Sequence, residues 1–159
     1  MELNATELKS FLDEKVQQYN TLAFINDDPI AIPHSFSKKE AIEIAAFFTA
    51  TIAWGNRKSI MTNARSLMKR MDNAPHDFIL NHTEKDLGVF DGFVHRTFQR
   101  EDVTFFVTRL QQLYREYGGL EVLFTPKTEE DNMHAVLSNF HNLFFACLLY
   151  TSPSPRDTN

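Results

Sequence analysis

The chain has 159 residues, of which 43% are apolar and fifteen are Phe, so it can form one compact domain with a sizeable core. No apolar run reaches the roughly 18 residues that cross a bilayer, and the polar N-terminus lacks the pattern of a secretion signal, so we expect a cytoplasmic protein without membrane contact. The single cysteine, Cys147, agrees with a reducing compartment because it cannot form a disulfide within the chain. The net charge of −5 disfavours a protein whose whole surface binds nucleic acid, which directs attention to local charge.

The N-terminal segment predicts an amphipathic helix followed by a loop. Asn4 and Glu7 have the spacing of a capping box, which marks the start of a helix. Apolar side chains then share one face, so we expect this helix to pack on the core as a lid; they are Leu8, Leu12, Val16 and Tyr19. Residues 20–36 contain two prolines and no clear period, which indicates an ordered loop.

The next two helices are predicted more strongly than any others. Ser37 and Glu40 have the spacing of a second capping box, and residues 38–54 are apolar on nearly every side, which is typical of a central helix. Gly55 should end this helix in a left-handed conformation, and Asn56 can start the next one. That helix has its apolar residues in a single stripe and should end before Asp72-Asn73.

The remaining patterns complete an all-α fold. We expect short helices over residues 76–81 and 83–90, a connector over 93–98, a long helix over 101–117 and a last helix after Thr128. Alternating strand patterns are essentially absent from the sequence. The prediction is an all-α, compact orthogonal bundle of six or seven helices.

The domain prediction divides the chain near its end. Residues 1–146 are expected to form one helical domain, whereas residues 147–159 form a polar run rich in Pro and Ser that follows an apolar helix without a cap. We interpret this run as a non-native, disordered tail, which would make the helical domain incomplete at its C-terminus. A native disordered C-terminus is the alternative.

A cluster of cations on the helix after Gly55 is the main functional signal. Residues 57–71 carry five cations and no carboxylate, a local charge of +5 in an acidic protein. At about 100° per residue, Lys58, Arg65 and Lys69 fall within an arc of roughly 40° beside the apolar stripe. Cations next to a helix N-terminus commonly hold phosphate groups, although an ordinary solvated helix face gives the same pattern. The predicted nucleic-acid-binding residues, including two from the connector, are Asn56, Arg57, Lys58, Arg65, Lys69, His95 and Arg96.

Other chemical groups give weaker signals. His134 and His141 lie seven residues apart, but the paired Glu-x-x-His motifs of a di-metal bundle are absent, so we predict no metal site and no cofactor. His76-Asp77 is similar to the pair that names a class of metal-dependent phosphohydrolases, with His34 and Asp131 as further ligands. A lone Trp such as Trp54 is more often part of a core than a platform for stacking bases. No catalytic residue can be assigned.

Several segments resemble the signature blocks of an uncharacterised bacterial family that is defined by a domain of unknown function. They are Asp28-Pro29-Ile30, Ile32-Pro33-His34, Ala53 to Lys58, Met71-Asp72 and Phe93 to Phe98, and the resemblance covers nearly all of residues 1–145. Members of that family are longer than this chain, which agrees with an incomplete domain.

The order of elements from Glu40 to Gly119 is also similar, more distantly, to the first half of the helix-hairpin-helix DNA glycosylases. That resemblance implies a role with DNA, with Asn56 or Arg57 as the residue that would enter the helix during base flipping. Residues 127–145 lack the Leu-Pro-Gly-Val-Gly hairpin of those enzymes, and neither their catalytic Lys nor their catalytic Asp has a matching position. The resemblance therefore implies DNA binding and no catalysis by this chain alone.

Three functions follow, in order of preference. The first is DNA binding by an uncharacterised protein with a DNA glycosylase-like helical fold. The second is a non-enzymatic helical module that binds an acidic protein partner. The third is a metal-dependent phosphohydrolase.

Overall fold

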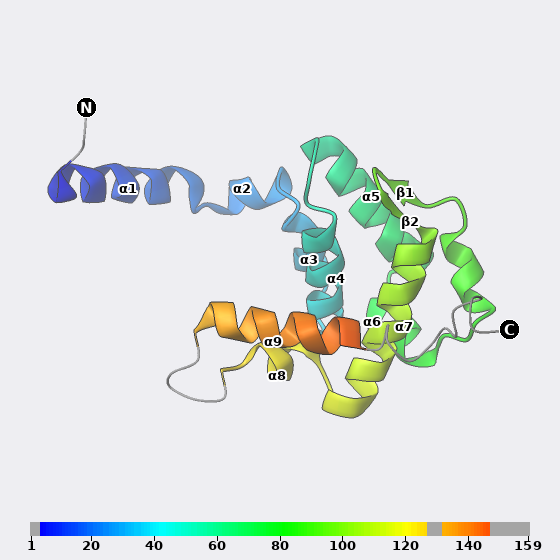
Figure 1. Cartoon of the computed structure of the whole chain (residues 1–159). Helices are drawn as coiled ribbons and strands as arrows, with labels where there is room; N and C mark the ends of the chain where they lie inside the picture. The colour runs from blue at the N-terminus through cyan, green and yellow to red at the C-terminus, as the bar shows by residue number, and fades with distance from the viewer. Residues whose placement is uncertain (1–3, 127–131, 147–159) are drawn as a thin grey trace, which may run out of the picture.

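The computed structural model describes residues 4–126 and 132–146, which fold into an all-α domain, as predicted (Figure 1). The predicted tail, residues 147–159, lies outside the described residues. The helices are α1 (Ala5–Tyr19), α2 (Leu22–Asn26), α3 (Ala31–His34), α4 (Lys39–Thr51), α5 (Arg57–Arg70), α6 (Pro75–Asn81), α7 (Arg100–Tyr117), α8 (Leu120–Phe124) and α9 (Met133–Phe145). A 3₁₀ helix, η1 (Asp86–Phe90), and a small antiparallel hairpin of β1 (Val94–His95) and β2 (Phe98–Gln99) connect α6 to α7.

Helix α4 lies at the centre of the domain, in contact with α3, α5, α6 and α8. Its inner side chains, such as Ile44 and Phe48, are completely buried. Helix α7 contributes a stripe at three- and four-residue spacing, including Val103, Val107 and Leu110, which is the pattern of an amphipathic helix that packs on a core. Aromatic rings from α4, α7 and α9 then join these helices, because Phe47, Phe106 and Phe144 all lie within contact distance of one another.

The sequence predicted a capping side chain at the start of three helices, and the structure confirms two of them. Asn4 and Glu7 form the predicted capping box of α1, and the Asn56 side chain accepts hydrogen bonds from the first-turn amides of α5. The box predicted at Ser37 and Glu40 was wrong, because α4 begins one residue later, with Lys38 as the N-cap and no side-chain cap. Glu40 consequently occupies the second helical position instead of the third, from which a carboxylate completes a capping box.

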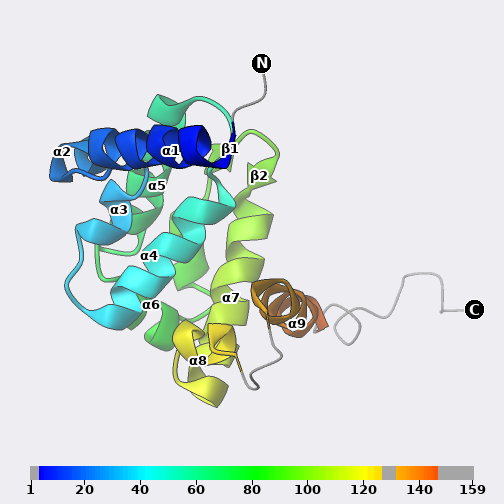
Figure 2. The same ribbon diagram turned by 90° about the vertical axis from the view of Figure 1, so that its left-hand side faces the viewer.

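Five other local predictions differ from the structure. Helix α4 ends at Thr51, with Ile52 as its C-cap, and not at Gly55. The loop predicted over residues 20–36 contains the short helices α2 and α3, and the connector predicted over 93–98 contains the β1–β2 hairpin. Helix α8 was not predicted either, and together with α2 and α3 it brings the number of α-helices in the described residues to nine instead of six or seven. Helix α1 does not form a lid: it buries no residue, and it extends away from the body of the domain (Figure 1). In the view turned by 90°, α1 therefore lies in front of the body (Figure 2).

Candidate nucleic-acid interface

The outer face of α5 carries the predicted cations. Its inner side chains, among them Ile60, Ala64 and Leu67, are buried and fix the orientation of the helix. Lys58, Arg65 and Lys69 are exposed, and within residues 4–126 and 132–146 none of them forms an ion pair with a carboxylate. At a rise of about 1.5 Å per residue, these three side chains span roughly 16 Å of helix. The structure therefore places them as the sequence predicted, in a row that faces solvent.

Arg70, the last cation of α5, has a different environment. Its guanidinium donates hydrogen bonds to the carbonyl oxygens of Val89 and, at 3.1 Å, of Asp91, and it lies 5.9 Å from the ring centroid of Phe93. Arg70 thus attaches η1 and the following turn to α5. Four of the five cations on this helix remain available to a ligand.

A surface hollow of about 580 Å³ lies at the N-terminal end of α5. It brings together four of the predicted residues, and its lining consists of Asp27, Asn56, Arg57, Lys58, Met61, Thr62 and Arg65. The Asn56 side-chain oxygen accepts from the backbone amides of Lys58 at 2.9 Å and Ser59 at 3.3 Å, so part of the helix N-terminus is already satisfied. The positive end of the helix dipole and the three cations of the lining still favour an anion here.

Asp27 and Thr62 were missed by the sequence analysis. Asp27 reaches the hollow because it follows α2, a helix that the sequence did not predict. Its carboxylate lowers the attraction of the hollow for anions. Thr62 faces outward from the second turn of α5, and its position could have been obtained from the same helical periodicity that placed Lys58.

The β1–β2 turn adds a fifth cation to the same region. Arg96 has a left-handed backbone, with φ of 57°, and its guanidinium lies 5.4 Å from the ring centroid of Trp54. The guanidinium also lies directly against Gly55, because a Cβ atom added to that glycine would be 2.5 Å from Arg96 Nε. The hairpin therefore holds a cation beside the turn that precedes α5.

Trp54 lies at the edge of this cationic region instead of in the core that the sequence favoured. Its side chain is 40% exposed, and its ring contacts His95 almost perpendicularly, with 5.7 Å between the ring centroids. An exposed indole next to cations is a surface on which a base can stack.

His95 is only 2% exposed, so it does not belong to the surface on which it was predicted. Its Nδ1 accepts a hydrogen bond from Asn63 Nδ2 at 2.8 Å, which leaves Nε2 to donate to the Trp54 carbonyl oxygen at 3.2 Å. These two hydrogen bonds connect the β1–β2 hairpin to α5 and to the turn between α4 and α5. His95 positions the interface and does not itself reach a ligand.

The groups considered for metal binding do not come together. Lys38 Nζ lies 2.9 Å from His76 Nδ1 and 3.8 Å from Asp77 Oδ1, and an ammonium group at this position opposes a bound cation. His34 is exposed on α3, and Asp131 lies outside the described residues. In the part of the chain that the structure describes, no group of three His, Cys, Asp or Glu side chains is arranged to hold a metal ion.

Fold and surface together define an all-α domain with an exposed cationic helix. The chain belongs to the family described as protein of unknown function (DUF2400), whose model matches residues 28–158. This match confirms the expected membership of a domain-of-unknown-function family. The comparisons with curated proteins and with solved structures give no significant match, so the resemblance to helix-hairpin-helix glycosylases gains no support. Among the described helices, none is both long enough and apolar enough to span a bilayer.

Proposed function

We propose that this chain binds DNA through the α5 surface, defined as Asn56, Arg57, Lys58, Arg65, Lys69 and Arg96. The observation that carries the proposal is a row of exposed cations without carboxylate partners among the described residues, in a chain whose net charge is −5. An acidic protein gains nothing in solubility from concentrating its positive charge on one helix, whereas a phosphate backbone requires such a concentration.

The dimensions of the α5 surface suit a short stretch of duplex. Lys58, Arg65 and Lys69 span roughly 16 Å along the helix axis, which equals about five base pairs at 3.4 Å each. Arg57 and Arg96 lie at the N-terminal end of the same row. Five cations that each neutralise one phosphate predict a slope of about −4.5 for the logarithm of affinity against the logarithm of salt concentration.

A titration of a fluorescent 20-base-pair duplex at several salt concentrations tests the proposal. Replacing Lys58, Arg65 and Lys69 together by Glu should weaken binding and reduce the magnitude of the salt slope by about 2.7, since three phosphate contacts are lost. The matched control replaces Lys38, Lys85 and Arg115 by Glu, which changes the net charge equally at exposed positions outside both the α5 surface and α1. If the two triple variants bind with the same affinity and slope, the DNA-binding proposal is wrong.

A second candidate is a non-enzymatic module whose α5 surface binds an acidic protein. The exposed cations of α5 favour it as well, because they are complementary to closely spaced carboxylates on a protein partner. A competition experiment at constant salt separates the two candidates. The concentrations of an acidic peptide and of unlabelled DNA that displace the labelled duplex are compared per negative charge. Displacement by the peptide at the lower concentration would favour the interaction module.

The finer interpretation as a DNA glycosylase-like protein adds a base-flipping step, for which Asn56 and Arg57 are the candidate wedge residues. The DNA-binding proposal does not depend on that step.

A further inference from the structure

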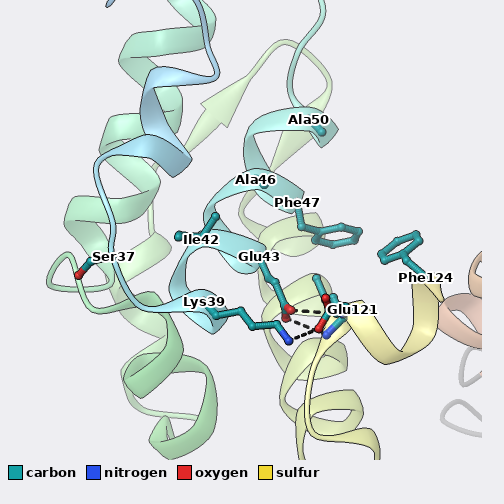
Figure 3. Close-up of a pocket in the computed structure, with 10 residues that line it drawn as sticks. Ser37, Lys39, Ile42, Glu43, Ala46, Phe47, Ala50, Glu121 and Phe124 are labelled. Atoms are coloured by element: carbon teal, nitrogen blue, oxygen red, sulfur yellow. Dashed lines mark hydrogen bonds and ion pairs between the residues drawn. The ribbon is translucent and has the colours of Figure 1, made fainter. Parts of the chain in front are cut away.

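The outward side of α4 forms the floor of an apolar groove that the α5 surface does not use. The groove is a hollow of about 620 Å³ between α4 and α8, and it is lined by Ser37, Lys39, Ile42, Glu43, Ala46, Phe47, Ala50, Leu120, Glu121 and Phe124 (Figure 3). Ile42, Ala46 and Ala50 recur at four-residue spacing, so they form one ridge along the helix. The small alanine side chains let another helix approach this ridge closely.

The polar groups of the groove already have partners. Glu43 accepts hydrogen bonds from the Tyr114 hydroxyl at 2.8 Å and from the Leu120 amide at 2.9 Å. Lys39 pairs with Glu121 (Figure 3). A polar small molecule would find few free donors or acceptors here. An apolar surface of helical shape is the better match.

Helix α4 would normally be covered on this side. A helix that is apolar on nearly every face belongs in a protein interior, yet Ile42 remains 37% exposed and Ala50 is exposed. The described chain therefore leaves one face of its central helix in contact with solvent.

Helix α1 provides the complementary surface. Leu8, Leu12, Val16 and Tyr19 fall within an arc of roughly 80° on this helix, and each of them is about half exposed. Figure 1 shows α1 extending away from the domain that carries the groove. An exposed apolar helix and an exposed apolar groove thus occur on the same chain.

We propose that two copies of this chain form a two-fold dimer in which α1 of each copy lies in the α4–α8 groove of the other. One helix in one groove would bury on the order of 800 Å² in total, which is the size of a crystal contact, whereas two reciprocal contacts would bury roughly 1,600 Å², the area of a stable interface. A reciprocal arrangement also closes the assembly at two copies. Both apolar surfaces are then covered without any further partner.

Sedimentation velocity of the full 159-residue chain between about 1 and 100 µM tests this proposal. The expected mass is twice the chain mass of 18.4 kDa. Replacing Leu12 and Val16 by Glu should give the monomer, since both side chains would place charge in the groove. Replacing Ser10 and Gln17 by Glu adds the same charge to the opposite face of α1 and should leave the dimer intact.

Several results would overturn the proposal: a monomeric wild type, open-ended association, or a Leu12→Glu, Val16→Glu chain that still dimerises. Because α1 buries no residue, these substitutions should leave the helical circular dichroism of the domain unchanged. An Ile42→Glu, Ala50→Glu chain should also be monomeric, since it alters the groove instead of the helix.

Thiol crosslinking distinguishes a second copy from the same copy. In a Cys147→Ser background, Leu12→Cys and Ala50→Cys on one chain should give a covalent dimer with a flexible bismaleimide. An internally linked monomer would show that α1 folds back onto its own groove, and it would overturn the two-fold dimer.

Discussion

Replacing Gly55 by Ala should affect both stability and DNA binding, because this glycine lies between the two helices and against Arg96. Gly55 has φ of +109°, a conformation that L-residues avoid, and a Cβ atom there would lie 2.5 Å from Arg96 Nε. The backbone strain should cost about 1–3 kcal/mol. The Arg96 side chain is flexible and would move, so its contact with the Trp54 ring, worth about 0.5–1 kcal/mol at an exposed site, should also be lost.

Two other glycines allow these effects to be separated. Gly118 also has positive φ, at +85°, but an added Cβ would meet nothing within 4 Å, so Gly118→Ala should show backbone strain alone, about 1–2 kcal/mol. Gly88 has neither a positive φ nor a neighbour within 4 Å, and Gly88→Ala should be nearly neutral. For a chain of this length each kcal/mol lowers the melting temperature by about 2–4 °C.

Thermal unfolding and the DNA titration together measure the effect. Gly55→Ala should lower the melting temperature more than Gly118→Ala, and it alone should reduce the magnitude of the salt slope by about 0.9, the value for one phosphate contact. Equal melting temperatures for the two variants would show that the contact between Arg96 and the Trp54 ring adds no stability, which would refute this reasoning. An unchanged salt slope would show that Arg96 does not contribute to DNA binding.

Three further predictions use the same assays. Asp27→Asn should tighten DNA binding roughly two-fold, since a unit charge about 8 Å from a phosphate costs about 0.5 kcal/mol in water; unchanged or weaker binding would contradict a role for the hollow. Arg96→Gly should weaken DNA binding while leaving the chain as stable or up to about 1 kcal/mol more stable, because relief of the left-handed strain exceeds the lost ring contact. Burial and the Glu43 carboxylate raise the pKa of Tyr114 above its ordinary value of 10.0. The unfolded chain therefore loses this proton first, so the stabilisation is complete below about pH 10 and declines as the pH rises further. Tyr114→Phe should cost about 1 kcal/mol at pH 7 and show a shallower decline in urea-unfolding free energy above pH 10 than the wild type.

The sequence predicted the fold class and most long helices because each has a strong local signal. The start of α5 follows from Asn56, whose side chain caps it, and the end of α7 follows from Gly118, which has a left-handed backbone. Short elements depend on tertiary contacts instead. Helix α8 begins at Leu120, whose amide donates to Glu43 on α4, and no local pattern indicates a cap that is 77 residues distant.

The same distinction applies to the candidate interface: positions within one helix could be predicted from the sequence, whereas positions that depend on tertiary contacts could not. Helical periodicity places Lys58, Arg65 and Lys69 on one face, because that arrangement is internal to the helix. It cannot place His95, whose burial depends on hydrogen bonds to Asn63 and the Trp54 carbonyl oxygen. A polar residue on a connector has the same local pattern whether its ring turns toward solvent or toward the domain.

The backbone of Arg96 supports its assignment to the α5 surface independently of its charge. Among the described residues, the non-glycine positions with positive φ are Asp72, Asn73 and Arg96. Asp and Asn tolerate the left-handed region because their short polar side chains can bond locally, whereas Arg has no such compensation. Strain of this kind persists where the surrounding structure requires it. The β1–β2 hairpin meets that requirement by fixing the turn, and the result is a guanidinium held over Trp54 beside the N-terminus of α5. A glycine at this position would make the same turn without strain, and the presence of Arg instead supports the proposal that this charge contacts DNA.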